Sequence, residues 1–284
     1  MKLSRTWVAI VLAVLVVTSS GCGLVNRIRA KNQLNEAANA YREAHLEEAE
    51  RRARRALELD PTNKTAPLFV ARIVHRQYKR GVNTEENIAK AREAVRLYKS
   101  ILQDDPKNEE AYKAIADLYG ALKQDQAQRD WILQRATDAN ADADKRAEAY
   151  IILASKDWHC SNEITDLPTN KTTTIDAANK KATVSYKKPK EEKEFQTAKM
   201  CVTRGLEEIE NAIKFDANSE PGWSFKTNLL LEASKLAEME GKMDQKGQLD
   251  KQRDDAEKRT AELNQANQKK KEEEAKKVAS PPAG

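Results

Sequence analysis

The chain has 284 residues, of which 39% are apolar, 33% charged and 5% aromatic. This composition has too few apolar and aromatic residues for one large globular core. It suits stacked helical pairs, each of which buries a narrow apolar stripe against its neighbours. The formal net charge of +5 falls to +3 without Lys2 and Arg5, the two charged residues of the first 21, and acidic and basic residues alternate along the rest. This argues against a concentrated basic face, so no nucleic-acid partner is expected.

The N-terminus has the pattern of an export signal. A short basic start is followed by an unbroken run of eleven apolar residues, Trp7–Val17, and then by small residues up to Cys22. Eleven residues are too few to cross a bilayer core, which needs about 20. We therefore predict a signal peptide over residues 1–21. If weakly polar residues are counted through to Val25, the run reaches nineteen, so an uncleaved anchor remains an alternative.

The Ser-Ser-Gly-Cys sequence that ends at Cys22 resembles the bacterial lipobox, although Ser19 stands where a leucine is commonest. This resemblance implies that Cys22 is lipidated and becomes the mature N-terminus, with residues 22–29 as a short membrane tether. Gly23, rather than aspartate, follows the cysteine, which by resemblance to enteric lipoproteins favours the outer membrane. Ordinary secretion, with Cys22 merely near a cleavage site, is the remaining alternative.

A repeated pattern of small residues begins near residue 30. Ala37, Ala49 and Ala56 are spaced along one segment that ends at Pro61, and proline cannot continue a helix. This pattern resembles the tetratricopeptide repeat (TPR), a helix–turn–helix unit of about 34 residues. The resemblance implies an all-α, TPR-like α-solenoid of antiparallel helix hairpins over residues 30–265.

The second unit ends at Pro106, 45 residues after Pro61, and its excess length is expected around Gly81. There Asn83 and Glu86 are spaced like a capping box that restarts the helix. The third unit begins well, but its second helix lacks the expected small residue. Further matching positions of the third, fourth and fifth units are Tyr112, Ile115, Tyr150, Leu153, Ala154, Gly205, Ala212 and Trp223.

The fourth unit is interrupted by an insertion, which we place at about residues 161–193. Two β-branched runs, Thr172–Ile175 and Ala182–Tyr186, flank a turn rich in Asp and Asn and predict a small β-hairpin. A long C-terminal helix follows the fifth unit and carries one apolar stripe. Residues 266–284 form a charged tail that is predicted to be disordered. The stripe consists of Leu249, Ala256 and Leu263.

Two cysteines remain if Cys22 is lipidated. In the frame that the repeat resemblance supplies, Cys160 and Cys201 fall at the facing ends of one helix pair, on either side of the insertion. In an oxidising compartment we expect them to form a disulfide, with two unpaired buried thiols as the alternative. His159 has no further ligand at zinc-like spacing, so no metal or other cofactor is predicted.

No catalytic constellation or phosphate-binding loop stands out, and we predict that the chain is not an enzyme. The TPR resemblance implies instead a concave groove that binds a protein or peptide partner. The residues expected to contribute to it are Lys113, Asp117, Ser155, Trp158 and Asn228.

Together these features predict a lipid-anchored scaffold on the periplasmic side of a bacterial cell envelope, which mediates protein–protein interactions such as the assembly of an envelope complex. An envelope enzyme or ligand-binding protein that uses the insertion as a lid is one alternative. A structural spacer is another.

Overall fold

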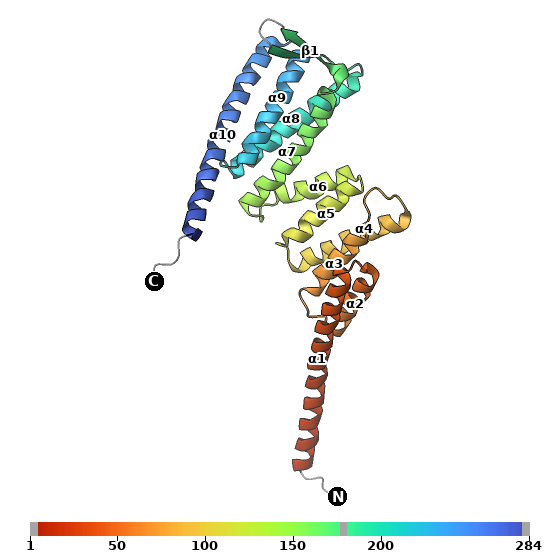
Figure 1. Ribbon diagram of the computed structural model, residues 1–284. Helices are drawn as coiled ribbons and strands as arrows, with labels where there is room; N and C mark the ends of the chain where they lie inside the picture. Colours follow the sequence, from red (N-terminus) through yellow and green to blue (C-terminus); the bar gives the residue numbers. More distant parts are fainter. Residues whose placement is uncertain (1–4, 177–180, 280–284) are drawn as a thin grey trace. The chain divides into compact units, whose positions relative to one another are not determined.

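The computed structural model describes residues 5–176 and 181–279, with side chains described over residues 23–175 and 182–276 (Figure 1). The chain divides into two compact units between Gln128 and Arg129. Each unit is described by itself below.

The first unit consists of antiparallel helix pairs joined by short turns. Consecutive helices pack on one another, as α1 on α2, α2 on α3, α3 on α4 and α4 on α5. This order confirms the predicted helical hairpins. The helices are α1 (Arg5–Arg42), α2 (Leu46–Leu59), α3 (Ala66–Gln77), α4 (Glu85–Asp104) and α5 (Glu109–Ala121), followed by α6 (Asp125–Thr137), which contains the division between the units.

Alanine allows the first two helices to pack closely. Ala37 of α1 and Ala49 and Ala56 of α2 are all fully buried, as the repeat pattern requires. The α2 helix ends at Leu59, directly before Asp60 and Pro61. The Asp60 carboxylate then accepts a hydrogen bond from the Thr62 amide at 3.2 Å, which fixes the turn.

The extra length of the second repeat lies between α3 and α4 and in the twenty-residue α4 itself. Gly81 has a φ of +79° in this connection, a conformation that favours glycine. The N-cap of α4 is Thr84, whose hydroxyl accepts from the Asn87 amide, so the prediction that Asn83 caps this helix is wrong. Asn87 holds the loop instead, because its side chain donates to the carbonyls of Lys79 and Val82 at 2.8 and 2.7 Å.

The second unit is a helical bundle that carries one small sheet. The α7 helix packs on α8 and α9, and α9 also packs on α8 and α10. One buried cluster joins Phe195, Ala198 and Val202 of α8 to Leu236 and Met239 of α9. The elements are α7 (Ala143–Thr165), the 3₁₀ turn Pro168–Asn170, β1 (Lys171–Asp176), β2 (Lys181–Tyr186), α8 (Glu192–Phe215), α9 (Glu220–Met239) and α10 (Met243–Ala279).

The β-hairpin confirms the prediction made from the two β-branched runs. Its strands are antiparallel, with Thr172 opposite Ser185 and Ile175 opposite Ala182. The flanking helices differ from expectation, since α7 continues to Thr165, inside the segment that was assigned to the insertion from residue 161. Its last turn is held by hydrogen bonds from the Ser161 and Thr165 hydroxyls to Glu232 of α9, at 2.9 and 2.6 Å.

Helical structure covers the predicted tether and the described part of the predicted tail, whereas residues 280–284 lie outside the described residues. The α1 helix runs without a break from Arg5, through the segment assigned to the signal peptide and through the predicted tether over residues 22–29. The α10 helix continues to Ala279, whereas residues 266–284 were expected to be disordered. Runs of Lys, Glu, Gln and Ala are strong helix formers, which accounts for the extension of α10. Where side chains are described, we find no helix both long and apolar enough to cross a membrane.

A disulfide joins the two helices on either side of the insertion. Cys160 of α7 and Cys201 of α8 are bonded, with their Cα atoms 6.2 Å apart and a sequence separation of 41. The pairing expected from the repeat frame is therefore present, and it closes the loop that contains the β-hairpin.

Replacing Cys160 and Cys201 together by serine should lower the free energy of unfolding by about 3–4 kcal/mol, because a loop of this length no longer restricts the unfolded chain. Chemical denaturation of wild type and double variant would measure the difference. Cys22→Ser serves as the control and should leave the midpoint unchanged. Equal midpoints for all three proteins would contradict a stabilising disulfide.

Candidate functional site: the groove of the first unit

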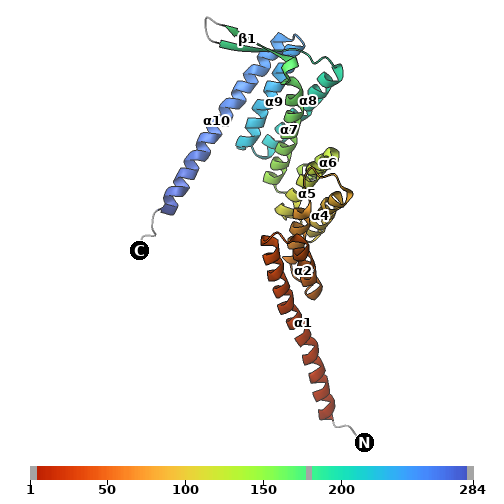
Figure 2. The same ribbon diagram turned by 45° about the vertical axis from the view of Figure 1, so that its right-hand side comes forward.

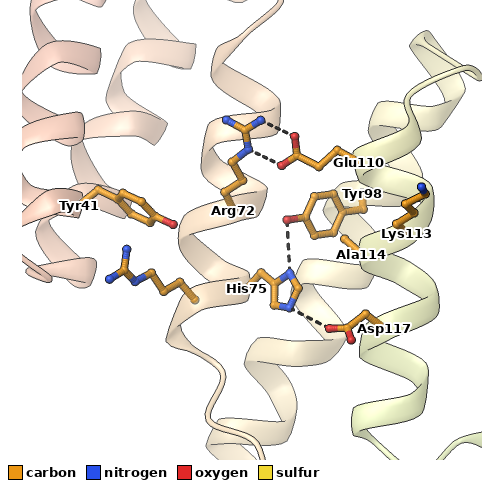
Figure 3. A pocket seen from close by; sticks show the side chains of 9 residues that line it. Tyr41, Arg72, His75, Tyr98, Glu110, Lys113, Ala114 and Asp117 are labelled. Atoms are coloured by element: carbon orange, nitrogen blue, oxygen red, sulfur yellow. Dashed lines mark hydrogen bonds and ion pairs between the residues drawn. The ribbon is translucent and has the colours of Figure 1, made fainter. Parts of the chain in front are cut away.

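A groove of about 640 Å³ lies among α1, α3, α4 and α5, and we refer to it as the first-unit groove (Figure 3). Both sides carry charged side chains, and aromatic rings lie between them. The lining residues are Tyr41, Arg72, His75, Arg76, Tyr98, Glu110, Lys113, Ala114 and Asp117.

Helical periodicity explains why these residues share one surface. On α3, Arg72, His75 and Arg76 follow the i, i+3, i+4 spacing of a single helix face. The residues between them, Ile73 and Val74, are completely buried. The polar face of α3 is therefore directed into the groove because its apolar face is held in the core.

The α5 helix provides the opposite side in the same way. Glu110, Lys113 and Asp117 lie on the groove, whereas Ile115 and Leu118 are fully buried behind them. This arrangement agrees with the helix period, in which residues three, four and seven apart lie on one face.

Two ion pairs connect α3 and its following loop to α5. Arg72 donates two hydrogen bonds to the Glu110 carboxylate, and Arg80 donates two to Asp117. The bond from Arg72 lowers the pKa of the Glu110 carboxyl below its usual value. Partly exposed pairs of this kind contribute about 0–1 kcal/mol each, so their main effect is to orient the side chains.

The centre of the groove is polar but uncharged at neutral pH. His75 Nδ1 lies 3.4 Å from the Tyr98 hydroxyl, and His75 Nε2 lies 3.7 Å from Asp117. Burial lowers the pKa of His75 below its ordinary value, more strongly than Asp117 raises it. Burial also raises the pKa of the Tyr98 phenol, so both rings are neutral and available for hydrogen bonding.

A cation and an aromatic ring form the edge near α1. The Arg76 guanidinium lies 4.7 Å from the centre of the Tyr41 ring, and Phe69 supports that ring edge-on at 5.7 Å. Arg76 is exposed, and within the described chain it forms no ion pair with a carboxylate. It is therefore free to meet an acidic group from outside, and Tyr41 offers a flat surface beside it.

Of the five residues predicted for the groove, Lys113 and Asp117 line it. Ser155, Trp158 and Asn228 belong to the second unit, where all three are half-buried on α7 and α9. The Trp158 ring packs against His159 and, at 6.0 Å, against Phe225, as expected for a packing residue.

The α3 side of the groove and its aromatic residues were not predicted from the sequence. The i, i+3, i+4 spacing of Arg72, His75 and Arg76 was a usable signal. No comparable signal marked Tyr41 or Tyr98 as groove residues, because tyrosines are equally common in helix packing.

The second unit contains a buried ionic network that was also not predicted. Asp157 of α7 is 1% exposed and accepts hydrogen bonds from Arg204 at 2.8 Å and from Arg129 at 3.2 Å. Arg129 also donates a hydrogen bond to the buried Glu208 carboxyl. Burial, together with the nearby Asp157, raises the pKa of the Glu208 carboxyl, while Arg129 opposes that shift.

A second buried carboxylate, Glu232 of α9, is completely satisfied. It accepts from Ser161 and Thr165 of α7 and from Lys235, whose Nζ lies 2.6 Å away. Charges at this depth require partners of this kind, so the cluster holds α7 on α9. Among the described side chains, no three His, Cys, Asp or Glu residues are grouped as a metal site would need.

The folded chain belongs to the class of helical repeat proteins built from TPR-like hairpins. No family model matches the sequence, and no curated protein matches it. Several solved structures are similar in fold, at low identity. MamA from Desulfovibrio magneticus RS-1 shares 14% identity, over 84% of this chain and 96% of MamA, with a TM-score of 0.39.

Two further solved structures have the same level of similarity. YrrB, described as a TPR protein with an unusual peptide-binding site, shares 12% identity over 76% of this chain and 84% of its own, with a TM-score of 0.36. PilF from Pseudomonas aeruginosa shares 12% identity over 80% of this chain and 91% of its own, with a TM-score of 0.35. The assignment to the class depends on the helix pairs of the chain itself.

The raised pKa of Glu208 predicts a pH-dependent stability. Between its ordinary pKa of 4.5 and its higher folded value, the folded protein holds a proton that the unfolded chain releases. The free energy of unfolding should therefore decline as pH rises above 4.5. Glu208→Gln should reduce this decline.

Denaturant unfolding at several pH values would measure the effect, with the exposed neighbour Glu207→Gln as the matched control. The free energy of unfolding should change less with pH for Glu208→Gln than for the wild type or for Glu207→Gln. If both variants follow the wild-type slope, Glu208 is ionised in the folded protein.

Proposed function

We propose that this protein is a binding scaffold of the bacterial cell envelope, in which the first-unit groove takes up an extended segment of a partner protein. The groove itself is the observation that carries the proposal. It combines an exposed cation, Arg76, with neighbouring rings and with hydrogen-bonding groups on α3 and α5. Helical scaffolds bind peptides through side chains of this kind.

The charged groups of the groove are better suited to binding than to acid–base catalysis. Glu110 and Asp117 are held by arginines, and the pKa of Glu110 is lowered. A general acid or base is instead tuned toward the operating pH, which for a carboxyl requires a raised pKa. We therefore propose recognition rather than turnover at this groove.

The envelope location and the lipid anchor are part of the same proposal. The disulfide between Cys160 and Cys201 supports an oxidising compartment, since such bonds are rare in the cytosol. The lipobox-like sequence before Cys22 supports lipidation, although the side chain of Cys22 lies outside the residues described by the structure. The outer membrane remains the expected site in a bacterium with two membranes.

Partner binding can be tested by placing a photo-crosslinking amino acid at Lys113, on the groove, in intact cells. We expect one discrete crosslinked protein, because the site takes a defined segment. A peptide from that segment should bind the purified chain in calorimetry, and Arg76→Ala should weaken binding about tenfold, or on the order of 1.4 kcal/mol.

The crosslinker at Arg96 is the matched control, because this α4 side chain is 73% exposed and does not line the groove. Equal crosslinking from Lys113 and Arg96 would show nonspecific contact. A peptide whose affinity is unchanged by Arg76→Ala and Tyr41→Ala would place the binding site elsewhere.

The intact mass of the membrane-extracted protein would test the anchor. We expect a mature chain that begins at Cys22 and carries additional acyl mass, because the lipobox-like sequence directs both cleavage and acylation. Cys22→Ala should leave the precursor uncleaved and unacylated. A full-length wild-type chain without acyl groups would contradict lipidation.

A further inference from the structure

The segment made of the β-hairpin and its connection to α8 carries an unusual share of the positive charge. Residues 171–190 contain six lysines and one aspartate, a net charge of +5, which equals the formal net charge of the entire chain. The other residues therefore balance overall. Acidic residues resume at Glu191, and Glu192 and Glu194 lie in the first turn of α8, where the helix dipole favours negative charge.

The two faces of the hairpin differ in character. Residues opposite one another on paired strands share a face, and successive residues alternate between faces. By this register one face carries threonines and Ser185, with Asp176 opposite Lys181 at its outer end. The other face has Lys171 and Tyr186 at its base and is mainly apolar beyond them. We call this outer part the apolar hairpin face, and its residues are Thr173, Ile175, Ala182 and Val184.

This apolar face is open to solvent. Ile175 is 72% exposed and Val184 41% exposed. In Figure 2 the two strands, in dark green, extend sideways past the helix ends of their own unit. An uncovered apolar face on an isolated two-stranded hairpin is unfavourable in water, because such hairpins are marginally stable without a partner.

The base of the hairpin, in contrast, is firmly held. Tyr186 packs against the buried cluster that contains Phe195 and Leu236. Its amide donates to Glu238 at 2.9 Å, and the Lys235 ammonium lies 5.1 Å from the centre of its ring. The hairpin is therefore presented from a fixed base, with its outer part exposed.

From this combination we propose that the apolar hairpin face docks on an anionic lipid surface. The face provides small aliphatic side chains that can enter the interface between headgroups and acyl chains. Exposed lysines at the base, including Lys187 and Lys190, can extend their ammonium groups to anionic headgroups. This surface is distinct from the first-unit groove and does not require acylation of Cys22.

A flat lipid surface fits the hairpin better than an acidic protein does. A protein partner of high affinity needs an anchoring pocket or a central hot spot. The first-unit groove and the two further cavities lined by Trp223 and by His45 contain no residue of the apolar hairpin face. The four side chains of the apolar hairpin face, with exposed lysines nearby, can contact a flat lipid surface that has no pocket.

The test uses the full chain reconstituted into vesicles, with an environment-sensitive fluorophore attached to Val184→Cys in a Cys22→Ser background. The vesicles consist of phosphatidylcholine alone or of phosphatidylcholine mixed with phosphatidylglycerol. In the anionic vesicles the emission should shift to the blue and be quenched by brominated acyl chains. The same probe at Thr183→Cys, on the opposite face of the same strand, should respond much less.

Two variants sharpen the test. Ile175→Glu places a charge on the apolar hairpin face and should abolish the response, without changing the unfolding midpoint because Ile175 is already exposed. Replacing Lys187 and Lys190 together by glutamine should reduce the preference for anionic vesicles by about tenfold. Peptide binding in the first-unit groove should be unaffected by either change, so the two proposals can fail separately.

A probe at Val184 that remains in a water-like environment in both kinds of vesicle would overturn lipid docking. Polyglutamate provides the competing outcome. If it shifts the probes at both Val184 and Thr183 while vesicles shift neither, the hairpin binds acidic protein segments, and the lipid proposal is wrong.

Discussion

Close approach of helices through alanine and glycine is the constraint on which both units depend. Ala49, Ala53 and Ala56 present one buried row along α2, so the neighbouring helix can lie against its backbone. Gly205 has the same role in the second unit. A Cβ atom built on Gly205 would lie 2.7 Å from Leu229 Cδ2 and 3.1 Å from Asp157 Cβ. Larger residues at these alanine and glycine positions would move the helices apart. The polar side chains on the outer faces of the helices would then be displaced.

The α7–α8 pair shows how one register is then selected. Along α7, successive turns carry Asp157 and Cys160, and along α8 their partners Arg204 and Cys201 follow in the opposite order. The same antiparallel alignment brings Ile164 to the cluster around Phe195. A buried ion pair contributes little net stability but penalises every other alignment strongly, because a shifted register leaves charges unpaired. The disulfide and the ion pair therefore specify the same register, which also determines where the β-hairpin begins.

Much of this fold could be predicted from local sequence, because its signals lie within one or two helical turns. The alanine spacing, Pro61 and the two β-branched runs are of this kind. The last turn of α7 was missed because Thr165 is held by Glu232, a residue far along the chain. The groove was predicted only in part for the same reason. Its orientation depends on Arg72 meeting Glu110 from the next repeat, and no local pattern specifies that pairing.

The two proposed surfaces differ in how their charges are balanced, and binding at each should therefore differ in range and in salt dependence. In the first-unit groove most charged groups already have partners, so a ligand gains affinity mainly through Tyr41, Arg76 and the shape of the cavity. Such binding should respond weakly to salt. In the hairpin and its connection to α8, the positive charge of residues 171–190 is not balanced within the segment, and the apolar hairpin face is uncovered. Attraction there should be longer in range and sensitive to salt, since screening acts most strongly on exposed charges. Under the two proposals together, one unit holds the chain at a charged surface while the other selects a partner by fit.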